Sequence, residues 1–85
     1  MFDEIEMNAL GYRYLQSGKV KDAIELFKLN TIAYPKSGNV YDSLGEAYLK
    51  DGQKELAIKN YEKSLEFNPD NENAKKILKQ IENNE

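Results

Sequence analysis

The residues able to do acid–base chemistry in this 85-residue chain are carboxylates, because the sequence contains neither histidine nor cysteine. Metal sites built from nitrogen and sulfur, triads with a histidine base and thiol chemistry are therefore excluded. Asp42 and Glu46 lie four residues apart, a spacing that places two carboxylates on one helix face. Surface carboxylates at this spacing are nearly always solvated, and the sequence has no glycine-rich phosphate loop. We therefore predict a protein that is not an enzyme, with no catalytic residue, metal site or cofactor.

The charges are mixed along the chain, with 12 basic and 15 acidic residues and a net charge of −3. This balance lacks the basic surface that nucleic-acid binding needs. No stretch approaches the roughly 20 apolar residues of a membrane span, and the first residues lack the basic and apolar regions of a signal peptide. We expect a soluble protein without nucleic-acid or membrane partners. The sequence leaves its compartment open, with the cytoplasm favoured.

Two helical patterns, joined at a turn, organise residues 41–69. Tyr41, Leu44 and Tyr48 recur at the three- and four-residue spacing of one helix face. Asp51-Gly52 interrupts this pattern as a turn. The second pattern ends before a proline, and its inward-facing members are Leu56, Ala57, Tyr61, Ser64 and Leu65. The two patterns predict an antiparallel helix pair.

The chain matches itself when it is shifted by 34 residues. The residues that match are Leu10, Gly11, Tyr14, Leu15, Gly18, Ala23, Ile24 and Pro35. They coincide with Leu44, Gly45, Tyr48, Leu49, Gly52, Ala57, Ile58 and Pro69. In addition, Met7 falls on Tyr41 and Phe27 on Tyr61, and the expected helix caps Asp3, Ser37 and Asn71 keep the same period. The repeat therefore includes the turns as well as the apolar faces.

This period and these residues resemble the tetratricopeptide repeat, with its aromatic residue, L-G-x-x-Y, turn glycine, A-x-x-x-F/Y and final proline. The resemblance implies an all-α, right-handed α–α superhelix (solenoid) in one domain, 1–85. Two helix-turn-helix repeats, 4–37 and 38–71, would be followed by a capping helix, 72–83. We expect five helices at about 4–16, 20–33, 38–50, 53–67 and 72–82. In the second of them we expect Ala23, Ile24, Phe27 and Thr31 to face inward.

A glycine inside a helix costs about 1 kcal/mol relative to alanine, so Gly45 predicts the close approach of another helix. We expect a larger side chain at Gly45 to destabilise the protein strongly. We expect the same change at Gly11 to be milder, because no repeat precedes that helix.

The first helix of each repeat lines the concave groove in this family, which implies a peptide-binding surface. The periodicity assigns a polar stripe to it: Asn8, Tyr12, Gln16, Asn39, Asp42, Glu46, Lys50, Asn73, Lys76 and Gln80. An ordinary polar surface without a ligand is the alternative. Some family members clamp a peptide carboxylate with lysine, arginine and asparagine. The matching positions here hold Asn8, Tyr12, Ser43, Asn73 and Ile77, so a clamp of that kind is not expected.

The N-terminal end of the solenoid carries apolar residues without a helix to cover them. They are Phe2, Ile5, Met7 and Ile32, and Arg13 stands where the second repeat has Ala47. Phe2 could fold back as a hydrophobic staple. Otherwise this edge is a contact site, for a second copy in a homodimer, for another protein or for the rest of a longer protein.

The function that the resemblance implies is a protein-interaction module that binds a peptide or protein segment of unknown identity. The alternative is a non-catalytic docking or oligomerisation segment that uses the apolar N-terminal edge. The two repeats resemble the short repeat tail of longer bacterial proteins, which favours that alternative.

Overall fold

The computed structural model describes residues 2–84, which form five helices and no strand. The helices are α1 (Glu4–Gln16), α2 (Val20–Ala33), α3 (Gly38–Lys50), α4 (Lys54–Phe67) and α5 (Glu72–Asn83). The helix boundaries predicted from the sequence are confirmed to within one residue. The expected all-α solenoid is confirmed as well.

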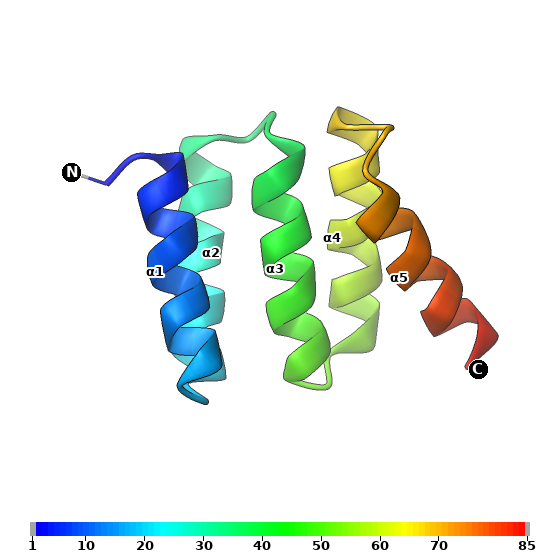
Figure 1. The fold of residues 1–85 in the computed structure, drawn as a ribbon, viewed down its shortest axis with the longest axis horizontal. Coiled ribbons are helices and arrows are strands. Elements are labelled where there is room, and N and C mark those ends of the chain that lie inside the picture. The colour runs from blue at the N-terminus through cyan, green and yellow to red at the C-terminus, as the bar shows by residue number, and fades with distance from the viewer. Residues whose placement is uncertain (1, 85) are drawn as a thin grey trace.

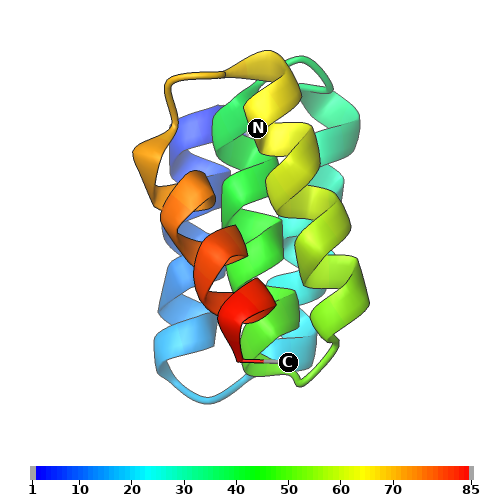
Figure 2. The same cartoon turned by 90° about the vertical axis from the view of Figure 1, so that its right-hand side faces the viewer.

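The helices form two layers, one made of α1, α3 and α5 and the other of α2 and α4 (Figures 1 and 2). Helix α1 packs on α2, α2 on α3, α3 on α4, and α4 on α5. The body measures 39 × 27 × 16 Å, and its long axis runs from α1 to α5 (Figure 1). Each repeat therefore contacts only its neighbours, as in other solenoids.

The helix pairs are joined by tight turns that depend on glycine. Gly18 after α1 and Gly52 after α3 have φ angles of 81° and 79°, in the left-handed region. Residues with a Cβ atom adopt this region at a cost that glycine avoids. The turns reverse the chain within three residues, so the two helices of a repeat lie antiparallel.

The predicted N-terminal caps are confirmed for two helices and wrong in one respect for a third. Asp3 and Glu6 form the expected capping box on α1. Asn71 accepts a hydrogen bond from the backbone N–H of Ala74 and so caps α5. Ser37 occupies the N-cap position of α3, but its hydroxyl donates to Glu4 Oε2 at 2.7 Å and caps nothing. A nearby carboxylate accepts a stronger hydrogen bond than a neutral group, and this explains the difference.

The core lies between the two layers and is aromatic at its centre. Phe27 and Tyr61, which the 34-residue shift superposes, are fully buried and face the helical glycines. A Cβ atom on Gly11 would stand 2.3 Å from Phe27 Cε1, and one on Gly45 would stand 3.0 Å from Tyr61 Cε2. The close approach predicted at Gly45 is therefore confirmed. The reason given for a milder effect at Gly11 does not hold, because the ring that meets this glycine comes from its own repeat and not from a preceding one.

One side chain predicted to face inward is exposed, two are half-buried, and the unexpected Asn30 is buried. Leu56 is 38% exposed, and Thr31 and Leu65 are half-buried. Asn30 is 1% exposed and donates from Nδ2 to the carbonyl oxygen of Glu4. Helical spacing alone does not separate adjacent positions on the edge of a buried face.

Within residues 2–84, no helix is long and apolar enough to cross a membrane.

Candidate peptide groove and N-terminal edge

The stripe predicted to line the groove lies on α1, α3 and α5, the helices of one layer (Figure 1). We call this surface the groove face. Part of it is occupied by contacts between repeats, and part of it is exposed.

Where α1 meets α3, the groove-face residues bind one another. The hydroxyl of Tyr12 donates to Glu46 Oε1 at 2.9 Å, and both side chains are half-buried. One turn earlier, the buried Ser43 hydroxyl donates to Asn8 Oδ1. Tyr12 and Glu46 are equivalent positions of the two repeats, so this hydrogen bond links the same site in neighbouring copies.

Where α3 meets α5, Asp42 is the acceptor. Asn71 Nδ2 donates to Asp42 Oδ2 at 2.7 Å, and Asn73 Nδ2 lies 3.3 Å from both carboxylate oxygens. Asn71 Nδ2 also lies 2.9 Å from the hydroxyl oxygen of Ser64, which in turn donates to the carbonyl oxygen of Gly38. A carboxylate and two amides thus fix the orientation of α5 against the second repeat.

The two carboxylates of α3 affect the ionisation of nearby tyrosines. Burial, together with the negative charges of Glu46 and Asp42, raises the pKa of Tyr12 to about 12 against the lowering effect of a hydrogen bond with Ser43. Burial also raises the pKa of Tyr61, again with a contribution from both carboxylates. Tyr12 consequently remains a protonated hydrogen-bond donor at neutral pH.

The other members of the groove face are exposed and available to a ligand. They are Gln16, Asn39, Lys50, Asn73, Lys76 and Gln80. Glu46 and Asp42, which are half-buried, lie on α3 between them. The groove face therefore has an acidic centre of two carboxylates and two lysines farther along its helices.

The apolar residues predicted for the N-terminal edge are mostly exposed, with Phe2 at 56%, Ile5 at 77% and Ile32 at 75%. Met7 is half-buried. Ile5 precedes Asn8 by three residues and Tyr12 by seven, and both of these reach α3, so Ile5 lies on the groove side of α1. Ile32 lies on α2, in the other layer.

An exposed residue that the sequence analysis missed stands one turn before Ile32. Leu29 is 54% exposed. The second repeat has Lys63 and Glu66 where the first has Leu29 and Ile32. A comparison of outward positions between repeats would have found it.

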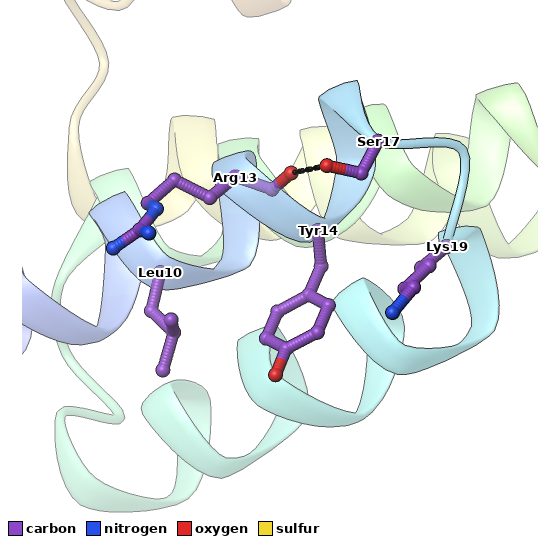
Figure 3. Close-up of a pocket in the computed structure, with 5 residues that line it drawn as sticks. All are labelled: Leu10, Arg13, Tyr14, Ser17 and Lys19. Carbon is purple, nitrogen blue, oxygen red and sulfur yellow. Dashed lines mark hydrogen bonds between the residues drawn. The ribbon is translucent and has the colours of Figure 1, made fainter.

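A pocket of about 220 Å³ opens beside α1 at the same end (Figure 3). It is lined by Leu10, Arg13, Tyr14, Ser17 and Lys19. Arg13 is one of the residues expected at the N-terminal edge, and the 34-residue shift superposes Leu10 and Tyr14 on Leu44 and Tyr48 of the second repeat. Leu10 and Tyr14 are half-buried, because no helix within residues 2–84 lies on this side of α1.

No group of three or more carboxylate, histidine or cysteine side chains in the described part of the chain is arranged to hold a metal ion.

Known proteins resemble this chain in sequence. A family model described as the tetratricopeptide repeat matches residues 38–71. Over 60 residues, 71% of this chain, the sequence is 38% identical to Superkiller complex protein 3 of Homo sapiens. Over 68 residues, 80% of this chain, it is 32% identical to the chloroplastic tetratricopeptide repeat domain-containing protein PYG7 of Arabidopsis thaliana. The matched segments make up 4% and 23% of these relatives, so the chain spans a small part of their length.

A solved structure shares the fold. The first TPR of Spaghetti (RPAP3), bound to the HSP90 peptide SRMEEVD, superposes with a TM-score of 0.57 and 19% sequence identity. The match covers 95% of this chain and 91% of that one. The stacked helix pairs with their glycine–aromatic contacts define a helical-repeat protein of the protein-interaction class. With the sequence matches, they show that the chain belongs to the tetratricopeptide-repeat family.

Proposed function

We propose that the chain binds an extended peptide or protein segment across the groove face and performs no catalysis. The observation that carries the proposal is that exposed polar side chains recur at equivalent positions of neighbouring repeats. Gln16 of α1 matches Lys50 of α3, and Asn39 of α3 matches Asn73 of α5.

The hydrogen bonds between repeats support this function by holding the groove face in one arrangement. The Tyr12–Glu46 and Asn71–Asp42 contacts fix α1 and α5 relative to α3. A surface fixed before binding does not lose side-chain and backbone freedom when its ligand arrives. These four residues would therefore position the groove face, while the exposed ones would contact the ligand.

The charge of the groove face favours a ligand different from the acidic peptide of the solved neighbour. That peptide, SRMEEVD, is bound by the first TPR of RPAP3. The positions that hold a carboxylate clamp elsewhere in the family here carry no cation, and Asp42 and Glu46 lie at the centre. A peptide with basic side chains complements these carboxylates, and we propose such a segment as the ligand.

The experiment compares two amidated peptides by chemical-shift titration: SRMEEVD and a version with its three acidic residues changed to lysine. We expect the lysine peptide to shift amides of α1, α3 and α5. The variant Asn39→Ala should weaken binding several-fold and leave the free energy of unfolding within about 0.5 kcal/mol of wild type. Lys59→Ala, exposed on α4 in the other layer, is the matched control.

Shifts that map outside the groove face, or equal affinity for wild type and Asn39→Ala, would contradict the proposal. Tighter binding of SRMEEVD than of the lysine peptide would be consistent with the groove face as the binding site, but it would refute the proposed preference for basic peptides.

The second candidate is a docking or oligomerisation segment that uses the N-terminal edge, and the exposure of Phe2 and Ile32 favours it. Exposed apolar side chains that gather on one surface mark interaction sites. A homodimer through this edge remains a prediction. Sedimentation of the wild type and of a Phe2→Asp, Ile32→Lys variant tests it, with a concentration-dependent mass expected in the wild type alone.

A further inference from the structure

The N-terminal edge contains a groove formed by both helices of the first repeat. The pocket beside α1 adjoins a second one of about 430 Å³, and the two share Leu10, Tyr14 and Lys19. The second pocket is completed by Asp22, Glu25 and Leu26 of α2. We call this combined surface the edge groove. Its floor is apolar, one rim carries Arg13 and Lys19, and the other carries Asp22 and Glu25.

The α1 part of this surface has a counterpart inside the molecule, where it is covered by a helix. Leu10, Arg13 and Tyr14 are equivalent to Leu44, Ala47 and Tyr48 of α3. These three α3 residues are 5%, 0% and 6% exposed, and they belong to the core that α2 helps to form. The covering element of the internal copy is thus the amphipathic helix α2, whose buried residues Ala23, Ile24 and Phe27 belong to the same core, with Phe27 also packed on Gly11 of its own repeat.

One ion pair fixes the covering helix in the internal copy. Lys21 Nζ of α2 lies 2.7 Å from Asp51 Oδ2, in the turn between α3 and α4. Gln53 Nε2 donates to the same carboxylate oxygen at 2.6 Å. Hydrogen bonding to Lys21 and then to Gln53 lowers the pKa of Asp51, so the acceptor is negative at neutral pH.

The edge groove differs from this turn at three matched positions. Ser17 stands in place of Asp51, Lys19 in place of Gln53, and Arg13 in place of Ala47. The hydroxyl of Ser17 donates to the backbone oxygen of Arg13 (Figure 3), and Lys19 Nζ lies 5.7 Å from the ring centre of Tyr14. A helix with a lysine at the position of Lys21 would meet the cation of Lys19 at this turn (Figure 3) in place of the Asp51 carboxylate.

We propose that the edge groove binds an amphipathic helix of a separate protein, one with an acidic residue where α2 has Lys21. Its small and apolar stripe packs on Leu10, Tyr14 and Leu26, as the stripe of α2 packs on the second repeat. Its carboxylate pairs with Lys19 at the turn. Basic residues on its other side face Asp22 and Glu25. This surface lies on the end of the solenoid, so the proposal does not depend on the groove face.

Binding is tested with two stapled, end-capped peptides of the α2 sequence, residues 20–33. One has the natural lysine at the position of Lys21, and the other has glutamate there. Stapling is needed because an isolated helix of this length is marginal in water. We expect the glutamate peptide to bind wild type at least about fivefold more tightly than the lysine peptide, which corresponds to one exposed ion pair gained and one repulsion avoided. Its chemical shifts should map to Leu10, Tyr14 and Leu26.

The charge-reversed variant Lys19→Glu makes the test specific. It should exchange the preference, so that the lysine peptide binds it more tightly than the glutamate peptide. The control is Lys79→Glu, the same change on the exposed side of α5 at the opposite end. It should leave both affinities as in wild type. Thermal melts of both variants should match the wild type, because both lysines are exposed.

Three results would overturn the proposal. Equal affinity of the two peptides for wild type and Lys19→Glu would show that the charges of the turn select nothing. Shifts confined to α3 and α5 would place the peptides on another surface. Concentration-dependent shifts of Leu10 and Tyr14 in the protein alone would show that a second copy covers the edge groove.

Discussion

The two repeats carry the same residues at the same positions and bury them to different extents. Leu44 and Tyr48 of the second repeat are 5% and 6% exposed, whereas Leu10 and Tyr14 of the first are half-buried. Helix α2 covers Leu44 and Tyr48, and no further helix within residues 2–84 covers Leu10 and Tyr14. This face is therefore buried by the adjacent repeat, and the apolar sequence pattern alone does not bury it.

The outward faces differ in the opposite direction. The first repeat has Leu29 and Ile32 exposed where the second has the charged Lys63 and Glu66. The second repeat therefore exposes charged side chains to water and buries the face that contacts its neighbour. The first repeat exposes apolar area on two sides, which concentrates candidate contacts at one end of the molecule.

The glycine–aromatic contacts give the largest expected difference between the repeats. The alanine Cβ atom in Gly11→Ala would lie 2.3 Å from the fully buried Phe27 ring, and we expect a loss of about 2 kcal/mol through overpacking. In Gly45→Ala the distance to Tyr61 is 3.0 Å. A smaller shift of that ring is offset by the roughly 1 kcal/mol that alanine adds to a helix. We therefore expect a change within about 1 kcal/mol, measured by urea unfolding.

The control for this comparison is Ala9→Gly, at an exposed position of α1, which isolates the helix-propensity contribution. Equal destabilisation by the two glycine substitutions would contradict this prediction, because it would mean that the Phe27 and Tyr61 rings move by equal amounts.

The caps of α3 and α5 give the next largest difference. Asn71 caps α5 and also bonds Asp42 and Ser64, whereas the equivalent Ser37 bonds only Glu4. We expect Asn71→Ala to cost about 2 kcal/mol, since a cap and partly buried hydrogen bonds are lost together. Ser37→Ala should cost about 0.5 kcal/mol. Urea unfolding of both variants measures this difference. Asp70→Ala, at the exposed position next to Asn71, is the control.

Tyr12 gives the smallest effect at neutral pH, where Tyr12→Phe should cost about 1 kcal/mol for the hydrogen bond to Glu46. Below pH 10 the phenol is neutral in both states, so its ionisation does not affect stability. Because burial raises the pKa of Tyr12 from 10.0 to about 12, the unfolded chain loses its proton first between these values. Stability therefore falls as pH rises through this window.

The measurement is the free energy of unfolding from pH 8 to 11.5 for wild type and Tyr12→Phe. The decline should be shallower in the variant, and parallel curves would contradict the raised pKa.

Much of the fold could be predicted because the 34-residue shift relates residues in helices and in turns together. Asp3 and Asn71 cap helices as their type and position indicated. Ser37 does not, because the side chain of Glu4, distant in sequence, accepts its hydroxyl. Local spacing contains no information about such a partner.

The sites were predicted less completely, for a related reason. Helical periodicity assigned Tyr12 and Asp42 to the groove face, but it could not show that they bind Glu46 and Asn71. Nor could it separate Leu10 from Leu44, since the two differ only in what lies next to them. Which of two identical side chains is exposed depends on assembly of the repeats, and this becomes visible in three dimensions.

The serial packing of the helices has a consequence for the time course of folding. Successive helices along the chain make the main contacts of the molecule, so each contact closes a short loop. Chains of this kind fold in microseconds to milliseconds, because little loop entropy is lost before contacts form. Helices α3 and α4 make the most extensive contact of any helix pair within residues 2–84. We infer that this central pair nucleates folding, and that the chain then orders outwards to α1 and α5.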